Sequence, residues 1–331
     1  IIMQELIFIG AYPASQGGIT RKAEAIYNQL KNRYHIKYIN INVSKRKGFN
    51  VIKCLFLLVF LVNKKDKIIY VLDNKRLDVL LTTQKAVCPQ SLKNTTVVIS
   101  GYSSKDVLQR KRLLNVLNHV KAIWIEGDRM RLELQKYISS QYVYYPNPRI
   151  IGCSFKPVLF KKNSSLKLLY YSQISKEKGL YDVIQIVDTL NEKTNVKFDI
   201  DFYGYVKEDV IEDFNRFIAN TSNAYYKGIN NAKKVEDYYG TLNQYDIMIF
   251  HTHWESEGVA GVCVDAKIAG ITIIADDHNF NSEVILENND EGIIVSEGDN
   301  DKIVSEIIRL YENPDVLNRY KKGSYNSRQR Y

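Results

Sequence analysis

The sequence predicts an α/β fold made of two doubly wound parallel-sheet domains. Short apolar strands alternate with helical segments in both halves of the chain, which is the pattern of a parallel sheet covered by helices. The alternation stops at residues 145–149, where two prolines within three residues block helix continuation, and we expect the interdomain linker there. A chain of 331 residues with 45% hydrophobic and 25% charged residues can form two ordinary folded cores.

The first half begins with an apolar run at residues 5–10 that ends in Gly10, which is typical of a buried parallel strand. A helix is expected at residues 21–31, where Ala23, Ile26, Tyr27 and Leu30 recur at helical spacing. A second helix is expected at residues 106–119. The other expected strands are residues 35–43, 67–72, 95–100 and 121–125. We take residues 1–150 as the first domain.

The second half repeats the pattern. Expected strands are residues 166–171, 197–203, 225–227, 245–251, 271–275 and 292–295. Helices are expected at residues 179–190, at residues 209–219 and from residue 301 onward, with Pro314 dividing the last one. We assign residues 151–315 to the second domain and residues 316–331 to a terminal helix that returns toward the first. Because ligands of open α/β sheets bind beyond the carboxyl ends of the strands, we expect the site in a cleft that these ends face.

Charge is distributed unevenly. Residues 1–150 contain 25 Lys and Arg against 9 Asp and Glu, a net charge of +16, whereas the remaining residues carry 21 against 28, a net charge of −7. A basic half favours an anionic partner, either a membrane surface or a nucleic acid. The four cysteines are scattered without CxxC spacing, which argues against a zinc ribbon or a disulfide framework and fits a reducing cytoplasm. We expect no signal peptide, because no basic segment precedes a long apolar run at the N-terminus.

The strongest motif follows the expected strand at residues 245–251. It runs from Glu257 to Asp265, and the residues next to Glu257 are Gly258, Val259, Ala260, Gly261 and Val262. Backbone amides at a helix N-terminus bind phosphate, and carboxylates in the loop and about two turns into the helix suit sugar and ribose hydroxyls. The alternative is a helix N-terminus with incidental acidic residues.

This motif resembles the acidic motif of the large retaining glycosyltransferase family 4, also called group 1. That family has the GT-B fold, in which two Rossmann-like domains face each other across a central cleft. The resemblance implies that Glu257 contacts the donor sugar as a catalytic residue and that Asp265 holds the ribose. Asp265 is one methylene shorter than the glutamate usual there, which weakens or re-angles that contact.

Other segments occur in the order of the same family. Lys178 matches a lysine that binds the donor diphosphate, and Gln173 stands where an arginine is expected. The remaining matches are Gly204, Gly228 and Ile229 at strand ends that cradle the nucleotide base, and Gly17 and Gly18 as the glycine pair near the donor phosphates. Singly, the lysine could be a solvated loop residue and the glycines ordinary turn residues.

His251 and His253 alternate along an extended segment, so both side chains lie on one face and invite a metal interpretation. Zinc needs further ligands, and the resemblance implies catalysis without a metal or cofactor, so we expect no metal and place His251 beside the donor pocket. In the first domain, Asp73, Tyr102 and Glu126 follow expected strands and either contact the acceptor or serve as caps.

The resemblance implies a retaining hexosyltransferase that moves a sugar from a nucleotide sugar, UDP-sugar favoured, to a glycan or lipid-linked acceptor in cell-surface polysaccharide synthesis. Transfer passes through an oxocarbenium-like transition state, and Lys178 with the amides near Gly17 and Gly261 would stabilise the leaving diphosphate. One alternative is a GT-B epimerase of sugar nucleotides, which needs no acceptor. Another is a non-enzymatic basic module that binds membrane or nucleic acid; we expect no nucleic-acid partner for the enzyme.

Residues 51–62 form an apolar run with Lys45, Arg46 and Lys47 before it and Lys64 and Lys65 after it. The run is shorter than the roughly 20 residues that span a bilayer. It is either a buried core helix or a segment at an anionic surface, where each cation contributes about 1 kcal/mol. We therefore expect a cytoplasmic protein that associates peripherally with the inner face of the membrane through residues 1–150.

Overall fold

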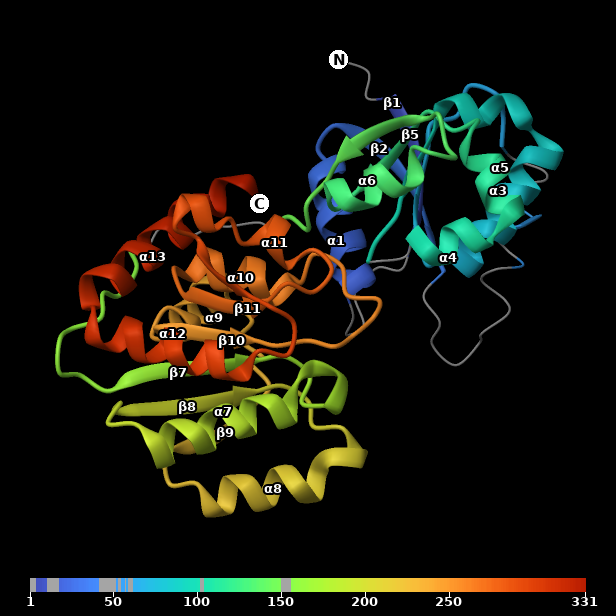
Figure 1. Ribbon diagram of the computed structural model, residues 1–331. Coiled ribbons are helices and arrows are strands. Elements are labelled where there is room, and N and C mark those ends of the chain that lie inside the picture. The colour runs from blue at the N-terminus through green and yellow to red at the C-terminus, as the bar shows by residue number, and fades with distance from the viewer. Residues whose placement is uncertain are drawn as a thin grey trace. The chain divides into compact units, whose positions relative to one another are not determined.

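The computed structural model describes residues 4–10, 18–41, 62–101, 104–149 and 156–331, together with residues 52, 55, 56 and 58. The chain forms two compact units, Ile1–Arg149 and Ile150–Tyr331 (Figure 1). Each unit contains a six-stranded parallel sheet flanked by helices. The predicted α/β architecture of two Rossmann-like domains is therefore confirmed.

The sheet of the first unit has the strand order β2-β1-β3-β4-β5-β6. Its strands are β1 (Gln4–Gly10), β2 (Tyr34–Asn40), β3 (Ile68–Val71), β4 (Thr95–Val98), β5 (Ala122–Ile125) and β6 (Gln141–Tyr144). Its described helices are α1 (Gly18–Leu30), α3 (Asn74–Val87), η1 (Pro89–Asn94), α4 (Ser104–Gln109), α5 (Lys111–Leu117) and α6 (Asp128–Leu134). All four residues of β3 are buried, which explains its continuous apolar sequence.

The sheet of the second unit has the order β12-β11-β10-β7-β8-β9. Its strands are β7 (Leu166–Tyr171), β8 (Phe198–Tyr203), β9 (Ala224–Gly228), β10 (Ile247–Phe250), β11 (Thr272–Asp276) and β12 (Gly292–Val295). Its longer helices are α7 (Leu180–Lys193), α8 (Ile211–Asn220), α9 (Val235–Leu242), α10 (Gly261–Ala269), α12 (Asn300–Glu312) and α13 (Pro314–Asn326). Its short helices are η2 (Lys176–Lys178), η3 (Glu208–Val210), α11 (Asn281–Val284), η4 (Glu287–Asn289) and η5 (Ser327–Arg330).

The sequence located most of these elements but missed β6, α3, α6 and α9 and merged two helices. The helix expected at residues 106–119 is broken at Arg110, whose backbone leaves the helical region (φ −96°, ψ 83°) between α4 and α5. Helix α9 is short and rich in tyrosine, and this composition does not produce a clear apolar stripe. The expected break at Pro314 is present, with the proline in the first turn of α13.

Helix α13 is anchored to the centre of the second sheet by a buried lysine. Lys321 Nζ donates to the carbonyl oxygen of Tyr245 (2.6 Å) and pairs with Asp246 Oδ1 (2.9 Å), directly before β10. Ser324 Oγ donates to the carbonyl oxygen of Ile271, directly before β11 (2.8 Å). The same end of the unit contains a second buried cation, Lys267, on α10. The last helix is therefore part of the core rather than an appendage.

Three sequence-based expectations fall wholly or largely outside the described residues: Gly17, Tyr102 and the apolar run at residues 51–62. Of that run the structure describes Ile52, Leu55, Phe56, Leu58 and Val62. Ile52 and Phe56 are in helical backbone one turn apart and are 65% and 59% exposed, whereas Leu58 is buried. Among the described helices, none has both the length and the apolar character needed to cross a bilayer.

Candidate active site

The loops that follow β7 and β10 are packed against each other because these strands are neighbours in the sheet. Gly179 has φ +71°, and a Cβ atom there would lie 1.9 Å from the carbonyl oxygen of His251. Only glycine combines this backbone conformation with this close approach. The His253 amide donates to the Glu177 carbonyl oxygen (2.8 Å) and joins the two loops a second time.

Buried Tyr170 fixes the shape of the loop after β7. Its hydroxyl lies 2.9 Å from the carbonyl oxygen of Gln173 and 3.0 Å from that of Lys178. Burial, the largest influence, raises the pKa of Tyr170 far above its usual value, so the hydroxyl stays a donor. The side chain of Gln173 is exposed.

Lys178 and Glu257 form an ion pair at this end of the sheet. Their side chains are 16% and 14% exposed, so the pair is largely but not fully shielded from water. Thr252 Oγ1 donates to Glu257 Oε2 (3.2 Å), and Lys178 Nζ lies 5.7 Å from the centre of the Trp254 ring. The structure thus brings the two predicted catalytic residues together although 79 positions separate them in sequence.

Helix α10 begins directly after this ion pair. Its N-cap residue, Ala260, has no side chain that could accept a hydrogen bond from the first backbone amides of the helix, so these amides can donate to a ligand or to other groups. Val259 and Ala260 are buried, while Gly258, Gly261 and Val262 are partly exposed. A helix N-terminus beside a lysine is an arrangement suited to binding a phosphate group.

Asp265 lies in the middle of α10 and is 1% exposed. Its carboxylate accepts hydrogen bonds from the hydroxyls of Tyr238 (3.0 Å) and Tyr239 (3.1 Å), both on α9. The Tyr238 hydroxyl in turn lies 2.7 Å from that of Tyr171, at the end of β7. The carboxylate predicted to hold a ribose is therefore covered by two tyrosine hydroxyls in this structure.

The ends of β8 and β9 meet at Gly204 and Gly228. The Gly204 amide donates to the Gly228 carbonyl oxygen (2.8 Å), and Tyr226 Oη donates to the Gly204 carbonyl oxygen (3.0 Å). A Cβ atom on Gly204, at φ +147°, would lie 1.8 Å from the carbonyl oxygen of Ser172. Ile229 follows with 41% of its surface exposed, so an apolar surface adjoins these glycines.

His251 directly follows β10 and is 1% exposed. Neither ring nitrogen has a hydrogen-bond partner, and Nδ1 lies 3.6 Å from Asp276 Oδ2. Burial raises the pKa of Asp276, and the charges of His251 and His278 act against that rise.

In the first unit, the candidates that the structure describes have structural partners. Asp73 caps α3 by accepting from the Arg76 amide (3.0 Å). Glu126 is buried in an ion pair with Lys22 and accepts from the Gly101 amide (3.2 Å). Burial lowers the pKa of Lys22, although Glu126 opposes this shift. Gly18 is the first residue of α1.

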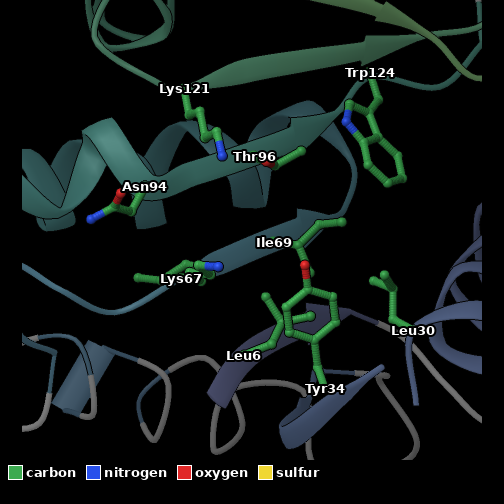
Figure 2. Close-up of a pocket in the computed structure, with 10 residues that line it drawn as sticks. Leu6, Leu30, Tyr34, Lys67, Ile69, Asn94, Thr96, Lys121 and Trp124 are labelled. Carbon is green, nitrogen blue, oxygen red and sulfur yellow. The ribbon is translucent and has the colours of Figure 1, made fainter. Parts of the chain in front are cut away.

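Two hollows in the structure lie away from the Lys178–Glu257 ion pair. The hollow in Figure 2, of ≈120 Å³, is lined by Lys67 and Asn94 and by Lys121, which stand directly before β3, β4 and β5. The other, of ≈260 Å³ in the second unit, is lined by residues that include Lys167 near the start of β7, Lys227 near the end of β9 and Tyr245, two residues before β10. Neither Lys178 nor Glu257 lines either hollow, so neither coincides with the Lys178–Glu257 site.

Sequence reasoning missed several residues of this site. Thr252 and Trp254 lie between the expected strand at residues 245–251 and the Glu257–Asp265 motif, but they have no charge that draws attention. Tyr171 and the adjacent Tyr238 and Tyr239 come from two places in the chain, and only the fold brings them together beside Asp265. A tyrosine pair in an acidic helix was the only signal available, and it does not specify a partner.

Residues 154–330 match the sequence model of a family described as "Glycosyl transferases group 1". This match covers just over half of the chain. The sequence matches none of the curated proteins with which it was compared.

Several solved structures share the fold. HepE of Anabaena in complex with UDP is 10% identical, with a TM-score of 0.69 over 99% of this chain and 95% of that one. Sucrose-phosphate synthase of Thermosynechococcus elongatus is 12% identical, with a TM-score of 0.68 over 99% and 94%. A variant of S. aureus TarM in complex with fondaparinux, alpha-GlcNAc-glycerol and UDP is 14% identical, with a TM-score of 0.60 over 84% of this chain. The present chain covers 55% of TarM.

Proposed function

We propose, for a chain that belongs to the group 1 glycosyl transferases, that it transfers a sugar with retention from a UDP-sugar to a glycan or lipid-linked acceptor. The observation that carries this proposal is the Lys178–Glu257 ion pair beside the N-terminus of α10. The complexes of HepE and TarM with UDP support the choice of uridine as the base. A role in polysaccharide or glycoconjugate synthesis belongs to the same proposal.

Each residue of the site has a proposed part in the transfer. Lys178 and the first amides of α10 bind the diphosphate and stabilise its charge as it leaves. Glu257 accepts hydrogen bonds from the donor sugar hydroxyls. The acceptor oxygen bonds to the anomeric carbon from the face that the diphosphate leaves, and the acceptor proton passes to a leaving phosphate oxygen. Protein cations and amides supply the stabilisation here, with no metal at the reacting atoms.

The base and ribose contacts follow from the surrounding strand ends. We propose that the base packs at Gly204, Gly228 and Ile229, where backbone and apolar surface are accessible. The Tyr238 hydroxyl covers Asp265, so a ribose hydroxyl would reach this carboxylate by displacing Tyr238 or would bind to the Tyr238 hydroxyl itself. The shorter side chain of Asp265, compared with glutamate, fits a site in which tyrosine hydroxyls occupy part of the space.

The test of this function is turnover of a panel of nucleotide sugars, with and without glycan and lipid-linked acceptors. Transfer of sugar from a UDP-sugar, with the product anomer matching that of the donor by NMR, supports the proposal. Epimerised nucleotide sugar without an acceptor would assign the chain to the epimerase alternative. Release of the sugar with inverted configuration would refute the retaining mechanism.

A membrane-bound acceptor is favoured by one observation in the first unit. Ile52 and Phe56, one helical turn apart, expose apolar side chains in the half of the sequence with net charge +16. We propose that these side chains enter the headgroup region of an anionic bilayer while nearby lysines bind its charge.

Co-sedimentation with anionic and neutral vesicles at two salt concentrations tests this association. Binding should require anionic lipid and should fall as salt rises, because charges are screened over about 10 Å at 0.1 M. Ile52→Ser/Phe56→Ser should reduce binding, whereas Leu132→Ser, which removes an exposed apolar side chain on α6, should not. Equal binding to both vesicle types would indicate a soluble acceptor instead.

A further inference from the structure

Three of the five histidines in the chain, His251, His253 and His278, lie together at the carboxyl end of the second sheet. The rings of His251 and His253 are 5.0 Å apart between centroids. Carboxylates from three other segments reach the same place: Asp182 in the first turn of α7, Asp276 at the end of β11 and Glu297 after β12. The sequence suggested a pair of histidines without further ligands, and the fold supplies them.

Asp182, His251 and His253 form one set of possible ligands. Each offers one ligand atom, and these atoms all lie within 4.8 Å of one another. Asp182 Oδ2 and His253 Nε2 are 2.8 Å apart. For comparison, ligands bound tetrahedrally to zinc at about 2.0–2.1 Å lie about 3.3 Å from each other. Small side-chain rotations would bring the three atoms onto one ion.

His251 provides an independent indication of a ligand. Its imidazole is fully buried, yet neither ring nitrogen has a hydrogen-bond partner, and the facing Asp276 Oδ2 has none either. Buried polar groups in folded proteins are nearly always hydrogen-bonded, because an unsatisfied group loses its hydration without compensation. A cation at this position would satisfy the imidazole of His251, and Asp276 would face the ion or its histidine ligand.

We propose that Asp182, His251 and His253 bind one divalent transition-metal ion, with Zn²⁺ as the preferred ion. Two imidazoles and a carboxylate match the ligand preference of zinc, whereas Mg²⁺ and Ca²⁺ prefer an all-oxygen set. A second possible set, His253, Asp276 and Glu297, shares His253. Glu297 has a 55% exposed side chain and is already paired with His278 (2.8 Å), so we assign the site to the first set.

The ion would position the donor site without entering the transfer chemistry. His251 and His253 flank Thr252, whose hydroxyl donates to Glu257. Asp182 belongs to α7, which begins directly after Gly179 in the loop that contains Lys178. An ion bound by these three residues would therefore fix the two loops that carry the Lys178–Glu257 ion pair. This inference does not depend on the identity of the sugar or the acceptor.

Metal binding can be measured directly on the full chain without an affinity tag. After removal of metal with a chelator, the protein is titrated with Zn²⁺ in a calorimeter and with Co²⁺ in a spectrophotometer, where visible absorption reports a tetrahedral site. We expect one equivalent of either ion to bind and Mg²⁺ not to compete. Zn²⁺ should also raise the Tm, because it binds the folded state.

The variants use the more exposed ligands, because replacing buried His251 risks unfolding the unit. His253→Gln and Asp182→Asn should each weaken Zn²⁺ binding by at least about tenfold and abolish the Co²⁺ absorption. His119→Gln in the first unit and Glu297→Gln are matched controls that should bind as the unchanged protein does. The proposal is refuted if the unchanged protein takes up no ion, if His253→Gln and Asp182→Asn bind normally, or if Glu297→Gln abolishes binding.

Discussion

The ion pair between Lys178 and Glu257 predicts opposite effects of two conservative substitutions on the binding of free UDP. Lys178→Gln removes a cation that would bind the diphosphate. Glu257→Gln keeps the shape of the side chain but releases Lys178 from its carboxylate partner. Since UDP contains no transferred sugar, the proposed contacts of Glu257 with sugar hydroxyls do not contribute, and only the effect through Lys178 remains.

The magnitude follows from the burial of the pair. Unit charges 4 Å apart attract each other by about 4 kcal/mol at an effective dielectric constant of 20, whereas exposed pairs contribute about 0–1 kcal/mol. With side chains 16% and 14% exposed, an intermediate coupling of about 1–2 kcal/mol is reasonable. We therefore expect Lys178→Gln to weaken UDP binding about tenfold and Glu257→Gln to strengthen it severalfold, since 1.4 kcal/mol corresponds to a factor of ten.

Isothermal titration with UDP measures these effects, and transfer assays should show that both variants lose activity. The double variant should bind UDP like Lys178→Gln alone, because Glu257 acts on UDP through Lys178. Lys176→Gln, which changes an exposed lysine in the same short helix, is the control and should bind UDP normally. If Glu257→Gln weakens UDP binding as much as Lys178→Gln does, Glu257 does not compete for the lysine and the reasoning fails.

Four other substitutions test the framework of the second unit. Gly228→Ala should lower the free energy of unfolding by about 1 kcal/mol, because φ is +73° but the space around the residue is open. Gly179→Ala should lower it clearly more in urea unfolding, because the new Cβ would meet the His251 carbonyl. Equal losses would contradict the close packing at Gly179. Tyr239→Phe should lower the free energy of unfolding by about 2 kcal/mol, because buried Asp265 loses a hydrogen bond, and should lower the Tm by about 4–8 °C. An unchanged Tm would mean that Asp265 does not need this donor. Burial lowers the pKa of Lys267 to about 8, although Glu291 opposes this shift. Between pH 8 and about 10.5 the unfolded state therefore binds more protons than the folded state, and the free energy of unfolding should rise with pH in this range. Lys267→Met should flatten that rise in denaturant melts, and an unchanged slope would assign the rise to other groups.

The sequence located every strand of the two sheets except β6, because buried strands such as β3 and β10 are continuous apolar runs with glycines or polar loops after them, whereas no residue of β6 is buried. It was less informative about α9, whose buried residues are Tyr239 and Leu242. A tyrosine packs as an apolar residue and also forms hydrogen bonds through its hydroxyl, so it does not mark a buried face clearly. The pairing of Lys178 with Glu257 follows from the adjacency of β7 and β10, which periodicity within a strand does not encode. The family resemblance predicted that Lys178 and Glu257 lie in one site, whereas only the structure revealed the tyrosines around Asp265.

The same reasoning explains why His251 and His253 alone did not predict a metal site. Their spacing places two ligands on one face. The third ligand, Asp182, lies 71 positions before His253 in the sequence, on α7, which follows β7 and not β10. No spacing rule along the sequence connects such residues. Only the sheet order, in which β10 lies between β7 and β11, brings them together.

The anchoring of α13 has a consequence for synthesis of the protein on the ribosome. Asp246, before the central strand β10, is paired with Lys321, which lies 75 positions later in the chain. While the intervening residues are still being translated, Asp246 lacks this partner and the strands β11 and β12 lack their contacts with α13. The second unit therefore cannot complete its fold in step with translation. It waits for its last helix to leave the exit tunnel, and in that interval apolar surface that the helix covers in the folded unit stays open to water.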